Sequence, residues 1–229
     1  MFLSEFTTVQ ATTGVNPPVV YALLTTIVII AIAIFITDVR IATKKEDIRK
    51  IATFEKISFD VFSEDMKKNV PSPTGSDWTI DELTAIYNSI KMPERKTSGA
   101  AGYDILAPFD INIPFGTSLV IPTGLRCKMN EAWDLEIVPR SGSGFKYGIR
   151  LANTTGIIDA DYYYSDRGGH IMVKLVNNDP AVNTKELAFH VDKENGFAQG
   201  LFRYCGLTLN DNATAQRSGG FGSTDKKKQ

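Results

Sequence analysis

The first strong pattern in this chain is an uninterrupted apolar run near its N-terminus. The segment PPVVYALLTTIVIIAIAIFIT, residues 17–37, has no charged residue, and none occurs between Glu5 and Asp38. Roughly 20 apolar residues, rising about 1.5 Å each, cross the roughly 30 Å hydrocarbon core of a bilayer. A buried helix of a soluble protein is rarely apolar on every face over such a length. The pattern therefore predicts a transmembrane helix over residues 18–37.

The charges that flank this run predict its orientation. No Lys or Arg precedes it, and the basic residues that follow it are Arg40, Lys44, Lys45, Arg49 and Lys50. The positive-inside tendency puts residues 1–17 outside as a short extracytoplasmic N-terminus and everything after the span in the cytoplasm. A cleaved signal peptide is the alternative, but it would carry basic residues before the run and a small-x-small cleavage site after it.

After the apolar run the pattern changes to that of a soluble body. Residues 38–53 predict a basic juxtamembrane helix or linker, and the alternation in FEKISFDVF, 54–62, predicts an opening strand. The polar stretch 63–78 contains two prolines and a glycine and predicts a loop. In 79–90, TIDELTAIYNSI, apolar residues at helical spacing and acids in the first turn predict a short helix.

From Lys91 onward, short apolar runs alternate with Gly, Pro, Asn and Asp. The runs are SLVIPTGLRCKM, DLEIVPR, HIMVKLVNN and LFRYCGLTLN, and no long amphipathic helix is visible among them. Turn signals at intervals of about 8–12 residues are typical of an all-β sandwich, barrel or jelly roll. The glycine-rich end, 217–229, predicts a flexible tail when taken in isolation.

Composition narrows the possible functions. The chain has 229 residues, a formal net charge of −1 and 22% charged residues, so it lacks the basic excess of a direct nucleic-acid binder. Its two isolated cysteines, Cys127 and Cys205, fit a reducing compartment. Its two histidines, His170 and His190, are too few for a histidine-rich metal site. Catalysis is therefore expected to depend on carboxylates, arginine and backbone groups.

Five short blocks follow one another in the second half of the chain. They are SGAAGYDI (98–105), PRSGSGFKYGI (139–149), NTTGIIDADY (153–162), GFAQG (196–200) and RSGGFGST (217–224). Singly each is a common turn or glycine-rich stretch, but in this order they closely resemble the five motifs of the trimeric dUTP diphosphatases, the dUTPases. The resemblance implies a jelly-roll or barrel β domain over 54–216. It also implies a homotrimer that hydrolyses dUTP to dUMP and pyrophosphate with Mg²⁺, which keeps uracil out of DNA.

The resemblance implies that Arg140, Ser141 and Gly142 hold the phosphate chain, and that Gln199 donates to it. A guanidinium, hydroxyls and small residues with accessible backbone N–H groups suit phosphate oxygens. The alternative for Arg140 is a pair with an acid at a subunit contact. Asp104 matches an aspartate near the water shell of phosphate-bound Mg²⁺, a metal that takes few protein ligands. Its alternative role is that of a turn-capping aspartate.

Two aspartates stand in the apolar block that ends in Asp159, Ala160, Asp161 and Tyr162. Asp159 matches the family's catalytic aspartate, a general base for the water that attacks the α-phosphorus, whereas Asp161 is expected to be structural. Tyr162 matches the tyrosine that packs on deoxyribose and excludes a 2′-hydroxyl. Strict strand alternation would place Asp159 and Tyr162 on opposite faces. The predicted hairpin must therefore curl or carry a bulge.

The same hairpin is expected to recognise the base. Uracil exposes one hydrogen-bond donor and two acceptors. Asn153 and the backbone of Gly156, Ile157 and Ile158 occupy the positions that match these groups in the family. The alternative for Asn153 is a turn residue. A wall at the 5-methyl position excludes thymine, and mispaired donors exclude cytosine. Met172 matches a position that lines the sugar pocket in relatives.

The tail resembles a lid that closes on the nucleotide. Arg217 is expected on the γ-phosphate, and stacking of Phe221 on uracil contributes roughly 1–3 kcal/mol. Gly222, Ser223 and Thr224 bring backbone and hydroxyl donors close to the ligand. In the family each site draws motifs one, two and four from one chain, motif three from a second and the tail from a third.

The chain also departs from the family pattern. The stretch YYYSDRGG lengthens the hairpin tip by about four residues. The family pattern assigns no role to Tyr163, Tyr164 and Arg167 in this stretch, and a contact with a neighbouring subunit or with an outside partner is expected for them. Gly196 stands where relatives have a basic residue. The helix at 79–90 and the membrane helix are additions to the family pattern.

Two rival functions remain. The dCTP deaminases have a related fold, but they need a glutamate after the hairpin, where HIMVKLV supplies no acid. A phage-type or membrane-tethered regulatory protein could use the same fold to bind a partner. Ammonia release from dCTP tests the first alternative, and pyrophosphate release from dUTP tests the second.

Overall fold

The computed structural model describes residues 17–179, 188–215, 217 and 219, and within 41–49 and at Pro17 it describes the backbone only. The chain divides into two compact units, Met1–Ile51 and Ala52–Gln229.

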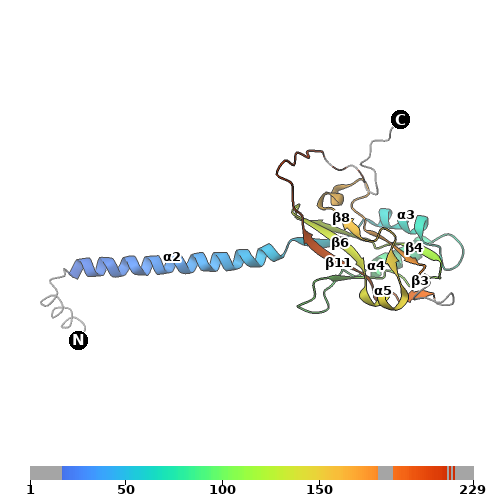
Figure 1. The fold of residues 1–229 in the computed structure, drawn as a ribbon, viewed down its shortest axis with the longest axis horizontal. Helices are drawn as coiled ribbons and strands as arrows, with labels where there is room; N and C mark the ends of the chain where they lie inside the picture. The colour runs from blue at the N-terminus through green and yellow to red at the C-terminus, as the bar shows by residue number, and fades with distance from the viewer. Residues whose placement is uncertain (1–16, 180–187, 216, 218, 220–229) are drawn as a thin grey trace. The chain divides into compact units, whose positions relative to one another are not determined.

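The N-terminal unit contains one helix, α2 (Pro17–Arg49), drawn without a break in Figure 1. Its stretch Pro18–Arg40 has a mean hydropathy of 2.9 and is not buried inside the protein. These 23 residues span about 35 Å at 1.5 Å per residue, enough to cross a membrane. The hydroxyls of Thr25, Thr26 and Thr37 donate to carbonyls one turn back, which satisfies their polar groups within the apolar helix.

Helix α2 continues through most of the segment 38–53, which was expected to be a juxtamembrane helix or linker, and strand β1 (Ala52–Lys56) starts shortly before the expected domain boundary at residue 54. The predicted helix at 79–90 is confirmed as α4 (Ile80–Ser89). Thr79 closes a capping box, because its hydroxyl accepts from Glu82 N while Glu82 Oε2 accepts from Thr79 N.

One element was predicted wrongly. The strand expected at 54–62 ends at Lys56, and helix α3 (Phe59–Asn69) occupies much of the stretch expected to be a loop. Its buried residues Phe62 and Met66 and the buried C-cap residue Val70 recur every four positions, the spacing of one helix face. Three apolar positions among many polar ones form a weak local signal, and tertiary packing on α4 and β4 decides the helix.

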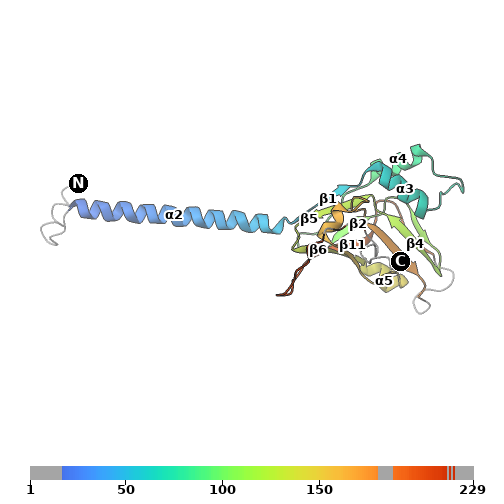
Figure 2. The same ribbon diagram turned by 90° about the horizontal axis from the view of Figure 1, so that it is seen from above.

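The rest of the body is mainly strands. Their bounds are β2 (Tyr103–Leu106), β3 (Ile111–Ile113), β4 (Thr117–Pro122), β5 (Leu125–Met129), β6 (Trp133–Pro139), β7 (Arg150–Leu151), β8 (Gly156–Ile158), β9 (Met172–Asn177), β10 (Phe189–Val191) and β11 (Gly196–Tyr204). Two short helical segments, α5 (Ser141–Tyr147) and η1 (Ala160–Tyr164), lie between them. The predicted all-β class with a helical insertion and an N-terminal apolar helix is confirmed (Figure 2).

The strands form small antiparallel sheets. The larger two have the orders β2-β11-β6-β8 and β4-β9-β7, and the others pair β1 with β5 and β10 with β3. Leu135 and Ile137 of β6, Ile121 of β4 and Leu175 of β9 are at most 1% exposed and belong to one core. Phe62 of α3 and Leu83 of α4 join this core and are likewise 0% exposed, as are other members of it. The helical insertion is therefore part of the folded body, since each such side chain contributes about 1.5–3 kcal/mol on burial.

Candidate active site

The segment that carries the third block crosses from one sheet to another. Strand β7 pairs with β9, with Leu151 opposite Leu175, and strand β8 pairs with β6, with Ile158 opposite Leu135. In the described part of the chain β7 and β8 therefore belong to different sheets. The hairpin expected around the tip YYYSDRGG is wrong, because its two arms, β8 and β9, also lie in different sheets and do not pair. The alternation of residues predicts strands, but the partner of each strand is chosen by tertiary packing.

A cavity of about 480 Å³ lies at this crossing, within the usual range for small-molecule sites. Eight residues expected from the sequence to bind nucleotide line it: Asn153, Gly156, Ile157, Ile158, Asp159, Tyr162, Met172 and Arg217. Strand β8 is an edge strand, so one side of its backbone is free of β-partners in the described structure. The structure thus brings the third block, Met172 and one tail residue together at one place.

A 3₁₀ helix explains how Asp159 and Tyr162 can act together. Strand β8 ends at Ile158, Asp159 caps η1, and Tyr162 N donates to Asp159 O at 3.1 Å. Residues three apart are eclipsed in 3₁₀ geometry, so both side chains reach the same cavity despite the alternation expected for a strand. The tyrosine hydroxyl donates to His170 O at 2.9 Å. Burial raises the pKa of Tyr162, which keeps this donor protonated.

Arg217 forms ion pairs with both carboxylates of the third block, those of Asp159 and Asp161. Its Nη2 lies 2.6 Å from Asp159 Oδ2 and its Nε lies 3.2 Å from Asp161 Oδ1. Its guanidinium carbon is 5.6 Å from the centre of the Tyr162 ring. Asp161, expected to bond to backbone or a neighbouring chain, is thus paired with the tail of its own chain. The Asp159 side chain is 47% exposed, so water reaches it.

A second cluster joins the first, second and fourth blocks. Asp104 of β2 lies opposite Gln199 of β11, and Gln199 Nε2 donates to Asp104 Oδ1 at 2.8 Å. Arg140 Nη2 lies 3.4 Å from Asp104 Oδ2, and Arg140 Nη1 donates to Gly196 O at 3.1 Å. The turn-capping alternative for Asp104 is wrong, because this residue lies within a strand and is 2% exposed. Arg140 meets its acid within the same chain.

The packing of Arg140 explains the departure at Gly196. A Cβ atom on Gly196 would lie 3.1 Å from Arg140 Nη1, closer than most real side-chain contacts. The glycine thus makes room for the guanidinium. Ser141 and Gly142 are exposed at the start of α5.

The two clusters remain separate within one chain. Asp104, Arg140 and Gln199 do not line the cavity that holds Asp159. Among the described residues no group of three or more His, Cys, Asp or Glu side chains is placed to hold a metal ion. Phe221, Gly222, Ser223 and Thr224, expected in the lid, lie outside the described residues.

The lengthened tip contacts β1 and α3 of its own chain, which together (residues 52–69) are called the extension below. Tyr163 donates to Glu55 Oε2 of β1 at 2.9 Å, and Arg126 lies over the Tyr163 ring and pairs with Glu55 at 2.7 Å. The bond from Tyr163, followed by that from Arg126, lowers the pKa of Glu55. Arg167 reaches α3, and Tyr164, 69% exposed, packs edge-on against Tyr163. Two of the three residues without an assigned role thus attach the tip to the extension.

Sequence reasoning missed three further polar residues that line the cavity. These are Asn69 of α3, His170, which precedes β9, and Lys174 of β9. Asn69 lies outside every recognisable block, and the only usable signal was the four-residue apolar spacing of its helix.

Comparison with known proteins identifies the family that this chain resembles. The dUTPase family matches residues 88–225. The deoxyuridine 5′-triphosphate nucleotidohydrolase of Wolinella succinogenes is 32% identical over 150 residues, which cover 63% of this chain and 93% of the relative. That of Nautilia profundicola is 35% identical over 142 residues, 59% of this chain and 91% of the relative. The solved dUTPase of Streptococcus mutans has 30% identity and a TM-score of 0.45, covering 51% of this chain and 88% of that one.

Proposed function

This chain belongs to the dUTPase family, and on that premise we propose that it hydrolyses dUTP to dUMP and pyrophosphate. The observation that carries the proposal is the convergence of Asp159, Tyr162 and the free edge of β8 on one cavity. Relatives that match over nine-tenths of their own length carry the name of this activity.

Asp159 is the proposed general base. A carboxylate within hydrogen-bond reach of the attacking water accepts its proton as the oxygen bonds to the α-phosphorus, and such catalysis contributes about 10²–10⁴-fold. Arg217 holds Asp159 Oδ2 in the free chain. The polyanionic phosphate chain of dUTP competes for the same guanidinium, so substrate binding transfers Arg217 to phosphate and frees the carboxylate.

The cavity supplies the selectivity for base and sugar. The free backbone edge of β8, with Gly156, Ile157 and Ile158, and the amide of Asn153 match the donor and acceptors of uracil. The ring of Tyr162 closes the sugar side of the cavity, where a 2′-hydroxyl would have to fit.

The second cluster, with Arg140 and Gln199 as proposed phosphate-binding residues, points to a site shared between chains. Arg140 and Gln199 do not line the Asp159 cavity in one chain, so a second copy brings them, with Ser141 and Gly142, to the phosphates. The proposed assembly is the homotrimer of the family, in which a monomer is inactive. Light scattering on the purified protein measures the number of copies directly.

Asp104 fits a supporting role toward Mg²⁺. Its Oδ2 is buried and has no hydrogen-bond partner, while its Oδ1 accepts from Gln199. Arg140 already pairs with this carboxylate, so Asp104 would act on the metal through its water shell rather than by direct ligation. When bound with the substrate, Mg²⁺ neutralises charge on the phosphate oxygens.

Helix α2 is proposed to anchor the enzyme as a single membrane span. Its apolar stretch is long enough, and the basic residues that follow it favour an orientation with the body in the cytoplasm and the N-terminus outside. The free thiols of Cys127 and Cys205 are compatible with a reducing compartment.

A nucleotide panel tests the function. The full-length protein in detergent is supplied with dUTP, dTTP, dCTP or UTP, with and without Mg²⁺, and pyrophosphate release is measured. Only dUTP is expected to be cut at an appreciable rate. If dUTP binds but remains uncut, the chain is a nucleotide-binding protein, and ammonia release from dCTP would instead establish a deaminase.

A further inference from the structure

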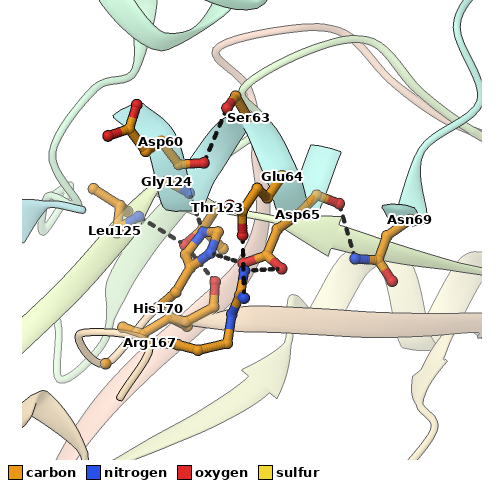
Figure 3. A network of polar contacts seen from close by, with 12 residues as sticks. Asp60, Ser63, Glu64, Asp65, Asn69, Thr123, Gly124, Leu125, Arg167 and His170 are labelled. Atoms are coloured by element: carbon orange, nitrogen blue, oxygen red, sulfur yellow. Dashed lines mark hydrogen bonds and ion pairs between the residues drawn. The ribbon is translucent and has the colours of Figure 1, made fainter. Parts of the chain in front are cut away.

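A buried carboxylate of α3 is bound to the segment that forms the active-site turn. The Asp65 side chain is 4% exposed, and its Oδ2 lies 2.6 Å from His170 Nδ1, whose ring is itself 2% exposed. Its Oδ1 accepts from Arg167 Nη2 at 2.8 Å (Figure 3). The two oxygens therefore meet one donor from the lengthened tip, Arg167, and one from His170, which directly follows the tip. Helix α3 itself lies outside the part of the chain that matches the family.

The hydrogen bonds determine the orientation of the histidine ring. Gly124 N–H donates to His170 Nε2 at 3.0 Å, so Nε2 is an acceptor and the ring proton lies on Nδ1. Nδ1 then donates to Asp65. The imidazole is thus bound on opposite sides, by α3 and by the turn before β5, and a rotation of the ring would break two buried hydrogen bonds.

The backbone carbonyl of His170 in turn contacts a residue of the candidate site, Tyr162. His170 O accepts a hydrogen bond from the Tyr162 hydroxyl at 2.9 Å, and both residues line the Asp159 cavity. Met172, two positions along, lines the same cavity. The position of the Tyr162 ring, which forms the sugar wall, therefore depends on the position of His170.

A charge so deeply buried is unfavourable unless its partners are in place. Asp65 is satisfied by Arg167 and His170, and Asn69 Nδ2 donates to its backbone carbonyl at 2.8 Å. The contact of Tyr163 with Glu55 attaches the same tip to β1 independently. The extension therefore holds the tip at two places, and the Asp65 contact reaches the Tyr162 hydroxyl through His170.

We propose that Asp65 is a positioning residue for the active site, which acts through His170 on Tyr162 and thereby sets the discrimination between dUTP and UTP. The inference rests on the proposed function. Asp65 does not touch the nucleotide, and its effect is on how closely the tyrosine wall excludes a 2′-hydroxyl.

The test compares Asp65→Asn with a matched control, Glu64→Gln, in the full-length protein. Both changes neutralise an acid on α3 that pairs with Arg167, but Glu64 is 67% exposed and, within the part of the chain that the structure describes, it contacts neither His170 nor the Asp159 cavity. The ratio of kcat/KM for dUTP to that for UTP is expected to fall about tenfold in Asp65→Asn and to stay at the wild-type value in Glu64→Gln.

Tyr162→Phe provides a second measurement that does not depend on the folding of the Asp65 variant. It keeps the ring and removes the bond to His170, so it is expected to lower the same ratio. The double variant should then lose little more than either single one, because both act on one contact chain. An unchanged ratio in Asp65→Asn or in Tyr162→Phe overturns the inference. A wild-type protein that leaves dUTP uncut overturns the proposed function itself.

Discussion

Arg217 Nη2 lies 2.6 Å from Asp159 Oδ2, so the tail residue expected to bind phosphate covers the carboxylate expected to activate water. The same guanidinium also meets Asp161. Two carboxylates close together repel each other, and a shared arginine offsets this repulsion in the absence of substrate. The contact therefore links the position of the tail to the availability of the base.

Replacing Arg217 with Ala is expected to lower turnover although it uncovers Asp159. The variant loses a charge-assisted bond to phosphate, and this loss outweighs the gain from a more accessible base. The expected net result is a kcat/KM about 10–100-fold below that of the wild type. Arg203→Ala is the matched control, because Arg203 pairs with Asp134 and Glu136 on the neighbouring strand, away from the cavity. A faster Arg217→Ala enzyme would show that the contact with Asp159 is purely inhibitory.

Asp159→Asn is expected to lower kcat by about 10²–10⁴-fold while dUTP binding, followed by calorimetry, is retained. The amide keeps the shape of the side chain but cannot accept the proton of water. Asp161→Asn serves as the comparison, since that side chain is 56% exposed and does not line the cavity. Turnover at the wild-type rate in Asp159→Asn would end the assignment of the base.

Gly169→Ala is expected to destabilise the tip of the active-site segment. The glycine has φ of +77°, and a Cβ atom would lie 2.7 Å from Tyr163 Cα and 2.9 Å from Tyr162 O, backbone atoms that cannot easily move. Gly116→Ala is the control, because it has a similar φ of +81° but no atom within 4 Å of the added carbon. The strain of positive φ, about 1 kcal/mol, is common to both. Thermal unfolding should therefore show a larger loss at Gly169, and equal losses would mean that the close contacts relax without cost.

The pairing of Asp65 predicts how stability depends on pH. Burial alone would raise the pKa of Asp65, but the bonds from His170 and Arg167 outweigh it and the pKa is lowered. A carboxyl whose folded pKa lies below its unfolded value, about 3.9, stabilises the fold above that value and loses this contribution as pH falls through the folded pKa.

The free energy of unfolding should therefore differ most between wild type and Asp65→Asn near neutral pH. The difference should shrink as the pH falls from about 5 to 3, measured by denaturant unfolding at each pH. A difference that stays constant over this range would show that Asp65 has the same pKa in the folded and unfolded chain.

Much of the candidate site was predictable from the sequence, because it depends on short blocks with ordered residue types. Asn153, Tyr162 and Met172 were expected to bind nucleotide and Asp159 to act as the general base, and all four line one cavity. The helix α4 was predictable as well, since its capping box involves residues three apart.

Other features depend on contacts that leave no local pattern. The bond between Asp65 and His170 joins residues 105 positions apart, and that between Glu55 and Tyr163 joins residues 108 apart. Helix α3 was missed because its stability comes from such contacts and from burial of Phe62, while its own sequence is mostly polar. The roles of Tyr163 and Arg167 were likewise unassignable, because their partners lie on that helix and on β1.

By itself the sequence determined the apolar helix, the β character of the body and the family to which the five blocks belong, because each of these signals arises from residues close together in the chain. Only the tertiary structure decided that β7 and β8 join different sheets, that Arg217 covers Asp159 and that α3 supports Tyr162. The physical reason is that burial and pairing are properties of surfaces brought together from distant parts of the chain, and a linear pattern does not state which surfaces will meet.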